Sequence, residues 1–335
     1  MPLSLTVVVV ITITALCFDF TNGFHDAANA IATSVSTRAL APRTALALAA
    51  VMNVAGASLG TGVASTIGDG IIEPGAGPGG LAVILAGVLA AIAWNLLTWR
   101  LGLPTSSSHA LIGGLVGAAL VSVTAVHWGG ILTLVVLPMV LSPVVGIVLG
   151  YLAHTLILWL FRRARPRRVT RGFHIAQTMS AAAMGLGHGL QDGQKSMGVI
   201  VLALVTAGYQ ERFHVPEWVV LMVALVIASG TYVGGRRIIR TLGHRIVHLD
   251  PPRGFAAEAG AAAVLYVTAF AWHSPISTTH TITSSILGAG ATRGLSAVHW
   301  NTATSIVGAW FLTLPGAATA GAAAYLALRA AAALL

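Results

Sequence analysis

Two short motifs that end in histidine are the first residues of this chain whose types and spacing could do chemistry. PTSSSH begins at Pro104 and PISTTH begins at Pro275. The two prolines are 171 positions apart (275 minus 104), and so are His109 and His280. A proline followed by hydroxyl residues is typical of a helix start, where free amides and the positive end of the helix dipole suit an anion. Two such helix starts facing each other predict a site for phosphate, sulfate or carboxylate.

The hydroxyl residues of both motifs are the candidates for binding this anion. A single motif of this kind is explained more simply by helix capping or close packing, but duplication at matched positions favours a binding role. We expect His109 and His280 to form hydrogen bonds that orient the two tips. The predicted anion-binding residues are Thr105, Ser106, Ser107, Ser108, Ser277, Thr278 and Thr279.

Two aspartates form a second, looser repeat. NGFHDAANAIATS contains Asp26, and HGLQDGQKSMGVI contains Asp192. A carboxylate at membrane depth is costly and usually faces a cavity with a partner, so function is the first hypothesis for both. Asn29 lies one turn after Asp26 and offers an oxygen ligand for sodium or another cation there. Lys195, the only lysine, takes the equivalent place beside Asp192, where it would replace a bound cation; a purely structural ion pair is the alternative.

Glu258 and four histidines complete the set of titratable candidates. Glu258 lies in GFAAEAGAAA, before the second motif, and is predicted to be a coupling group. A solvated position near the helix start is the alternative for this residue. His25, His109, His188 and His280 lie in or beside the motifs and could carry protons near neutral pH.

The composition places these residues in a membrane protein. Of 335 residues, 56% are hydrophobic and 8% are charged, which is unusual for a water-soluble chain. Apolar runs of about 20 residues, enough to cross the hydrocarbon core as helix, recur along the sequence. We therefore predict a multi-pass protein of the cell membrane. Cys17 is the sole cysteine, so an intrachain disulfide is impossible, and we expect it to be a small buried residue.

Arginines cluster in two short segments, which predicts the orientation of the chain. Residues 162–172 and 236–253 are basic, and the excess of positive charge in short loops indicates the cytoplasmic side. Both termini are then outside. Affinity for anionic lipid is an expected consequence. Nucleic-acid binding is disfavoured because neither segment belongs to a recognisable nucleic-acid module.

The duplicated motifs predict two inverted halves. The fold class is an all-α integral membrane protein with two inverted-topology repeats, each with transmembrane helices, a broken helix and a re-entrant helical hairpin. The alternative has each hairpin arm as a full span, and it stays open for the arm at 81–101. The first repeat covers 1–161, with a hairpin at about 81–122. The basic loop 162–172 joins it to the second repeat, 173–335, which holds the basic loop 236–253 and a hairpin at about 255–292.

Two rival functions are weaker. GASLG, which begins at Gly56, matches the G-x-S-x-G pattern of hydrolases, but a helix rich in glycine and alanine produces such matches cheaply and lacks the strand-to-helix turn. No HExxH zinc motif occurs. A passive anion channel is disfavoured because inverted halves suit alternating access and paired acids suit ion coupling.

Taken together, these motifs resemble the inorganic phosphate transporter (PiT) family over nearly the whole chain. The resemblance rests on NGFHDAANAIATSVSTRAL, GLPTSSSHALIGG, HGLQDGQKSMG, GFAAEAG and PISTTH, in that order. It implies a symporter for inorganic phosphate that is driven by protons or sodium, with phosphate at the hairpin tips and cations near the aspartates. No cofactor is expected. A sulfate permease of the same fold is an alternative, and a homodimer is one option for the oligomeric state.

Departures from the family pattern bear on the coupling ion. The family motif has asparagine before each aspartate, where this chain has His25 and Gln191. Sodium-coupled members often carry asparagine at the place of Lys195 and an acid at the place of Asn53. Both differences remove a cation site, so we predict proton coupling. In relatives with this lysine, the resemblance also implies uptake of phosphate as a neutral complex with a divalent metal.

Overall fold

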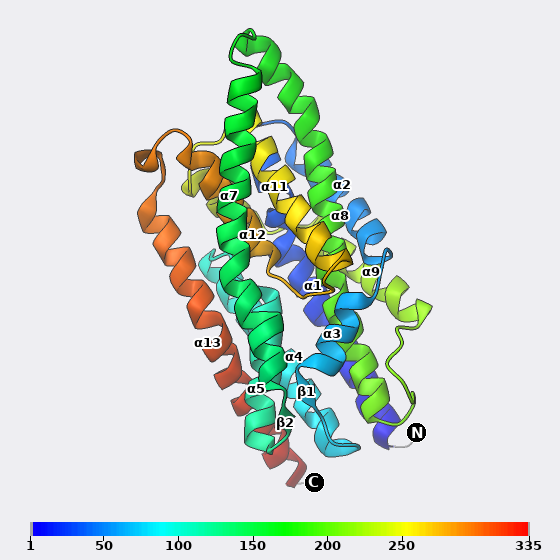
Figure 1. Ribbon diagram of the computed structural model, residues 1–335. Coiled ribbons are helices and arrows are strands. Elements are labelled where there is room, and N and C mark those ends of the chain that lie inside the picture. The colour runs from blue at the N-terminus through cyan, green and yellow to red at the C-terminus, as the bar shows by residue number, and fades with distance from the viewer. Residues whose placement is uncertain (1–2, 334–335) are drawn as a thin grey trace.

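A computed structural model of the chain describes residues 3–333 as a bundle of helices (Figure 1). Strands β1 (Ile72–Glu73) and β2 (Ala125–Val126) pair antiparallel and form the only sheet of the described residues. The predicted all-α fold is therefore confirmed. The α-helices are α1 (Leu3–Ser36), α2 (Pro42–Ala57), α3 (Gly62–Gly70), α4 (Pro78–Leu101), α5 (Ser107–Ser122), α6 (Trp128–Ile131), α7 (Leu137–Leu160), α8 (Pro166–Thr206), α9 (Glu217–Val233), α10 (Arg236–Arg240), α11 (Pro251–Phe270), α12 (Thr278–Ala291) and α13 (Trp300–Ala333).

Several of these helices are long and apolar enough to cross a membrane. Among the described residues there are 4 such helices: α1, α4, the run from α6 to α7, and α13; the number rises to 6 if each of two bent helix pairs counts as one span. The chain is thus a multi-pass membrane protein. The arm α4, with 24 residues, has the length of a full span, whereas α5 has only 16 residues and extends about 24 Å. The first hairpin therefore combines one long arm with one short arm.

Two segments expected as loops are largely helical. Helix α8 begins at Pro166, a residue preorganised for a first helical turn, so only the start of the basic stretch 162–172 is a loop. In 236–253, α10 is followed by a π-helical turn at Thr241–Arg245. Helix α3 occupies the segment 62–70 and is bent by 73° from α2, while α9 and the helical segment after it meet at 59°. These bent pairs are the broken helices, because the helices that carry Asp26 and Asp192 are continuous.

Glycines let α1 and α8 approach their neighbours closely. A Cβ atom on Gly23 of α1 would lie 2.4 Å from the carbonyl oxygen of Ile227 in α9. A Cβ atom on Gly189 of α8 would lie 2.3 Å from the carbonyl oxygen of Asn53 in α2. Only glycine fits such contacts between helix backbones. The two crossings have the same construction, and Gly23 and Gly189 stand in the same relation to Asp26 and Asp192 in the sequence.

The helices that follow the two hairpins, α7 and α13, run in opposite directions, in keeping with the predicted inversion (Figure 1). Figure 1 shows α7 rising from the end of the bundle where both termini lie and α13 descending towards it. Helix α5 packs against α4 and α13, while α12 packs against α11 and α7. The repeated VHW sequences also act alike, because the amide of His127 donates to the oxygen of Ile71 (3.0 Å) and that of His299 donates to the oxygen of Ile246 (2.9 Å).

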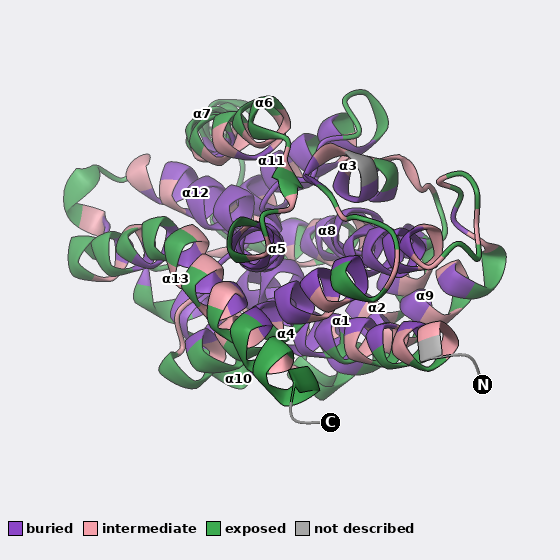
Figure 2. Cartoon of the chain, turned by 90° about the horizontal axis from the view of Figure 1, so that it is seen from below, coloured by how far each residue is buried: buried purple, intermediate pink, exposed green. Residues whose placement is uncertain are grey.

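The bundle has a buried middle and an apolar outer surface. Figure 2 shows α12 almost wholly buried, whereas α7 has a largely exposed side. Exposed leucines, valines and aromatic residues are what a lipid-facing surface needs. Cys17 is exposed on α1, so the expectation that it is buried is wrong. The two basic segments lie at one end of the bundle, since Thr37 contacts Gln177 near the start of α8 and Ser36 contacts Gly243.

Candidate functional site

The two hairpin tips meet inside the bundle. The hydroxyl of Ser108 donates to the carbonyl oxygen of Ile276 at 3.2 Å, which joins the first tip to the second. The rings of His109 and His280 lie edge to face with centroids 5.0 Å apart. His280 also stacks on Trp310 of α13 at 4.0 Å, and this indole donates to the oxygen of Pro104 at 3.0 Å. Both ring nitrogens of His280 and Nδ1 of His109 are buried without a hydrogen-bond partner among the described residues, so the two rings contact the tips by packing and not by the expected hydrogen bonds.

Each tip ends in a capped helix start. Ser106 accepts from the amide of His109 at 3.2 Å, and Ser277 accepts from the amide of His280 at 3.1 Å. Both caps follow from a hydroxyl residue just before the first helical turn. The amides that begin α5 and α12 have no acceptor within their own helices, because the first turn of a helix leaves its donors free. Two sets of donors and two positive dipole ends therefore point into one region.

Asp26 of α1 contacts both tips. Its carboxylate accepts from the hydroxyl of Ser107 at 3.0 Å and from that of Thr279 at 3.4 Å. The Nδ1 atom of His25 lies 2.6 Å from the same carboxylate. The other ring nitrogen of His25 lies 3.1 Å from Thr98 Oγ1, which accepts from Thr105 at 3.0 Å. One carboxylate therefore links α1 to the first-turn hydroxyls of both hairpins.

Asp192 of α8 lies on the other side of the same cluster. Lys195 Nζ is 2.8 Å from one of its oxygens, and His188 Nε2 is 3.1 Å from the other. Asn22 of α1 donates to that second oxygen at 3.3 Å, and Thr278 donates to it at 3.5 Å. All of these side chains are buried. Asp192 thus has partners from α1, α8 and the second hairpin.

Lys195 joins the two aspartates through one hydroxyl. Its ammonium donates to Ser107 Oγ at 2.8 Å, and the same hydroxyl donates to Asp26. The result is an unbroken chain of polar contacts from Asp192 to Asp26 through Lys195 and Ser107. An ammonium at this position supplies one positive charge where two carboxylates meet.

Asn29 occupies the matching position on α1 without a charge. Its amide donates to Thr278 at 3.2 Å and to Thr279 at 2.9 Å, and its carbonyl oxygen is buried without a hydrogen-bond partner among the described residues. Ligand atoms of Asp26, His188 and Asp192 all lie within 4.8 Å of one another. Oxygen and imidazole ligands so close together could hold a cation. The cation site predicted near Asp26 and Asn29 thus has neighbours from α8 as well.

Glu258 lies apart from this cluster. Its carboxylate accepts from the hydroxyls of Thr33 on α1 and Ser180 on α8. Glu258 is buried, so the alternative of a solvated position is wrong. Thr33 follows Asp26 by two helical turns on the same face of α1, which puts Glu258 about 10 Å along the helix from the central cluster.

Sequence reasoning missed Asp19, a second buried acid on α1. Its carboxylate accepts from Ser196 at 2.9 Å, and its second oxygen has no partner among the described residues. Asp19, Asp26 and Thr33 follow one another at seven-residue intervals, so they form one stripe along the helix. An acid within an apolar run is a visible signal, because carboxylates at membrane depth are rare.

Gln191 and Gln194 were also not assigned a partner from the sequence. Gln191 donates to Thr268 Oγ1 at 3.0 Å and so contacts the last turn of α11, much as His25 contacts Thr98 of α4. Gln194 accepts from the amides of Val63 at 2.8 Å and Ala64 at 3.1 Å, and therefore caps α3 from a neighbouring helix. The partners of both side chains are remote in the sequence, so no local pattern identifies them.

Comparison with known proteins agrees with this arrangement. The sequence model of the phosphate transporter family matches residues 22–170 and 162–321. The chain belongs to the phosphate transporter family. It is therefore a membrane transporter and not an enzyme, and the family's substrate is phosphate. The hydrolase alternative is wrong, and Ser58 of GASLG instead follows the end of α2 and donates to the oxygen of Val54 at 2.9 Å.

Relatives cover almost the whole chain. A protein of Bacillus subtilis named "Probable low-affinity inorganic phosphate transporter" is 44% identical over 97% of this chain and 98% of its own length. One of the same name from Rhizobium meliloti is 48% identical over 93% of this chain and 94% of its own length. A solved structure titled "The sodium-dependent phosphate transporter" has a TM-score of 0.89 at 24% identity and covers 97% of this chain and 99% of that one. At this identity the match shows the fold.

Proposed function

We propose that this member of the phosphate transporter family imports inorganic phosphate by symport with protons, by alternating access. The observation that carries the proposal is the closed cluster in which both hairpin tips, Asp26, Asp192 and Lys195 are joined by direct contacts. Because these side chains are buried, phosphate can enter or leave only when the tips separate on one side. Two inverted halves provide one such opening on each face.

Phosphate binds, in this proposal, between the starts of α5 and α12. The free first-turn amides and the hydroxyls of Ser107, Ser108, Thr278 and Thr279 are the donors, and Lys195 supplies a positive charge. In the closed cluster, the hydroxyls of Ser107 and Thr279 are already donated to Asp26. Protonation of Asp26 weakens it as an acceptor and releases these hydroxyls for phosphate. Proton uptake and phosphate binding are coupled through the same two donors.

The buried charges support cation coupling. Asp19, Asp26 and Asp192 stand against one fixed cation, Lys195, in a region closed to water. Burying an uncompensated charge is strongly unfavourable, and an arriving phosphate adds more negative charge. Protons or metal cations must therefore enter with phosphate. His25 and His188, each beside a carboxylate, are additional proton carriers.

Sodium coupling is the second candidate, and two observations favour it. The solved structure with the same fold is titled as sodium-dependent, and Asp26, His188 and Asp192 offer a cluster of cation ligands. The same cluster would hold a divalent metal that arrives as a neutral complex with phosphate. Against sodium stands Lys195, whose ammonium already lies 2.8 Å from Asp192. We therefore place the mobile cation at Asp26.

Uptake of radiolabelled phosphate into proteoliposomes tests the proposal. An imposed proton gradient should drive uptake without sodium, and arsenate should compete better than sulfate. Asp26→Asn and Asp192→Asn should each abolish uptake, whereas Glu73→Gln, which changes an exposed acid, should leave it intact. Folding of each variant is checked by its elution and melting in detergent. A requirement for sodium in the unaltered protein would favour the second candidate, and full uptake by either aspartate variant would refute the site.

The hairpin tips need a test of their own. Replacing Ser107 and Thr279 with alanine removes one hydroxyl donor from each tip but leaves both helix caps in place. Phosphate affinity should fall by about tenfold or more per lost donor to a charged oxygen. Ser229→Ala, which changes an exposed serine bonded only within α9, is the matched control. Unchanged affinity in the double variant would place the phosphate elsewhere.

A further inference from the structure

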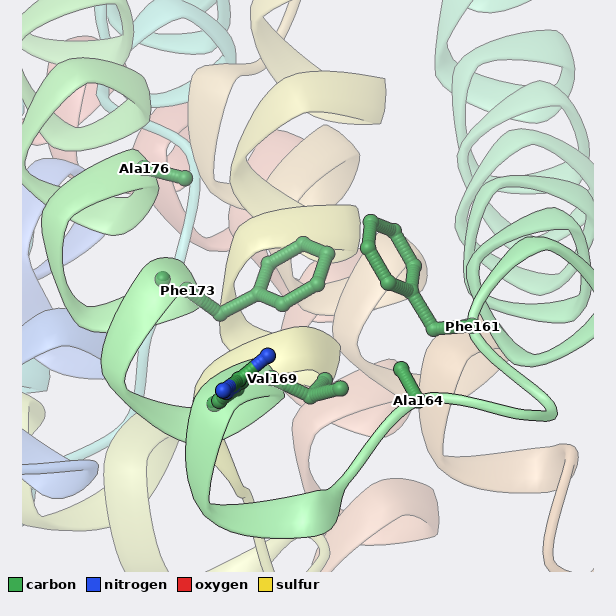
Figure 3. Close-up of a pocket in the computed structure, with 7 residues that line it drawn as sticks. Phe161, Ala164, Val169, Phe173 and Ala176 are labelled. Carbon is green, nitrogen blue, oxygen red and sulfur yellow. The ribbon is translucent and has the colours of Figure 1, made fainter.

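A pocket of about 310 Å³ opens where α7 ends and α8 begins (Figure 3). Its wall is apolar except for one arginine. Figure 3 shows Phe161, from the end of α7, and Phe173, from α8, facing each other across it. The lining residues are Phe161, Ala164, Arg168, Val169, Gly172, Phe173 and Ala176. An apolar chamber with a single cationic group suits a ligand that is itself apolar with one anionic end.

The pocket is backed by protein and open towards the outer surface. Phe161 and Phe173 lie edge to face at 5.5 Å, and Phe173 packs in turn on Phe255 of α11 at 5.4 Å. Phe173 is 7% exposed and Phe161 is 43% exposed, so the opening is on the side of α7. That side continues as the exposed apolar surface of α7, which includes Leu156 and Trp159. The pocket is therefore accessible from the lipid-facing surface.

The segment that contains Arg168 carries positive charge without a local counterion. The described residues contain no carboxylate within ion-pair distance of the arginines in residues 162–171. The sequence has no acidic residue between Glu73 and Asp192. The start of α8, a helix of 41 residues, adds its positive dipole end at the same place. The arginines of this segment, all exposed, are Arg162, Arg163, Arg165, Arg167, Arg168 and Arg171, of which Arg168 lines the pocket.

We propose that this pocket is a binding site for one anionic phospholipid. The headgroup phosphate lies against Arg168, and an acyl chain fills the apolar chamber, where it packs against the touching rings of Phe161 and Phe173. Basic pockets between membrane helices are typical sites for anionic headgroups. A soluble phosphate gains nothing from the apolar wall, and a zwitterionic lipid leaves the arginine charge less well neutralised. Because the connection between α7 and α8 joins the two predicted halves, the bound lipid would fasten them at their junction.

Native mass spectrometry of protein released from nanodiscs tests this site. The nanodiscs contain phosphatidylcholine with an equal fraction of phosphatidylglycerol, and the retained lipids are counted. Two variants test the contacts to the two parts of the lipid, its headgroup and its acyl chain. Arg168→Gln removes the headgroup contact, and Gly172→Leu fills the chamber without loss of charge. The Gly172 position has no atom within 4 Å of an added Cβ, so the leucine does not clash with the fold.

Each variant has a matched control. Arg167→Gln removes the same charge from a residue outside the pocket lining, and Met179→Leu adds a leucine at an exposed position of α8. We expect Arg168→Gln and Gly172→Leu to lower retained phosphatidylglycerol at least about fivefold, and the controls to change it less than twofold. Phosphatidylcholine adducts should not change.

Three outcomes would overturn the proposal. Equal losses in Arg168→Gln and Arg167→Gln would mean a diffuse attraction of lipid by the whole basic segment. Normal retention in Gly172→Leu would show that no acyl chain occupies the chamber. Displacement of phosphatidylglycerol by an equal concentration of soluble glycerol phosphate would show that the headgroup alone accounts for binding.

Discussion

Replacing Lys195 with asparagine is the sharpest perturbation of the proposed coupling. The ammonium lies 2.8 Å from Asp192 and 2.8 Å from the Ser107 hydroxyl, with every partner buried. At an effective dielectric constant of about 20, the attraction between charges 2.8 Å apart is about 6 kcal/mol. Removing one partner of a buried pair costs about 3–5 kcal/mol after relaxation. In the variant, any other positive charge that binds beside the Asp192 carboxylate is therefore strongly stabilising.

A bound proton or a sodium ion can supply this positive charge, and the substituted side chain favours sodium. Asparagine offers a carbonyl oxygen at the position that Asn29 holds on α1, so the two halves of the site become chemically alike. A free energy of about 3–5 kcal/mol corresponds to a change of roughly 100- to 5,000-fold in an equilibrium constant. We expect phosphate uptake by Lys195→Asn to become strongly dependent on sodium, at concentrations that leave uptake by the unaltered protein unchanged.

The assay is proteoliposome uptake under a fixed proton gradient with sodium varied and ionic strength held constant. Lys195→Arg, which keeps the charge, should stay independent of sodium. Lys195→Asn leaves the buried Asp192 charge unpaired and should lower the melting temperature. The double variant, Asp192→Asn with Lys195→Asn, removes both charges, so it should regain the original melting temperature but show no sodium-dependent uptake. Proton-driven uptake by Lys195→Asn at the original rate, with no response to sodium, would refute the view that Lys195 replaces a cation.

Three further changes test the parts around this centre. Glu258→Gln keeps hydrogen-bonding atoms for its two hydroxyl partners but loses the charge. Gradient-driven uptake should therefore fall at least about tenfold while phosphate exchange persists. Loss of both activities would indicate a structural role. Gly189→Ala should lower stability by about 1–3 kcal/mol through overpacking, seen as a lower melting temperature, whereas Gly172→Ala should not. Asp19→Asn removes one buried negative charge and should lower the number of cations per phosphate, measured from the reversal potential; an unchanged ratio would exclude Asp19 from coupling.

The structure brings together residues that the repeated sequence motifs single out. The matched spacing of PTSSSH and PISTTH placed two helix starts together, and the structure joins them through Ser108 and Ile276. Asp26 and Asp192 were recognisable because carboxylates at membrane depth are costly. Each of these predictions rests on a pattern within one segment or on a repeat of that pattern, which a single sequence displays directly.

Contacts between remote segments were not predictable in the same way. Gln194 caps α3 across the bundle, and nothing near Val63 or Gln194 indicates the pairing. Helix α3 was not predicted as a separate element, since a short segment rich in glycine does not indicate a helix until a neighbour satisfies its first amides. Asp19 differs from these cases. Its signal, a carboxylate within an apolar run, is present in the sequence just before the NGFHD motif.

In the proposed symport, the unequal chemistry of the two halves decides where the mobile cation acts. On α8 the acid has a partner on its own helix, because Lys195 lies one turn after Asp192 with its ammonium 2.8 Å from the carboxylate. On α1 the equivalent residue, Asn29, is neutral, so in this proposal the charge of Asp26 is neutralised by the transported cation. Both carboxylates nevertheless connect to the Ser107 hydroxyl, one directly and one through Lys195. In this proposal, a cation that binds at Asp26 changes the hydrogen bonding of Ser107, which contacts Asp26 directly and Asp192 through Lys195. The Ser107 hydroxyl therefore becomes available to phosphate even though it does not itself bind the cation.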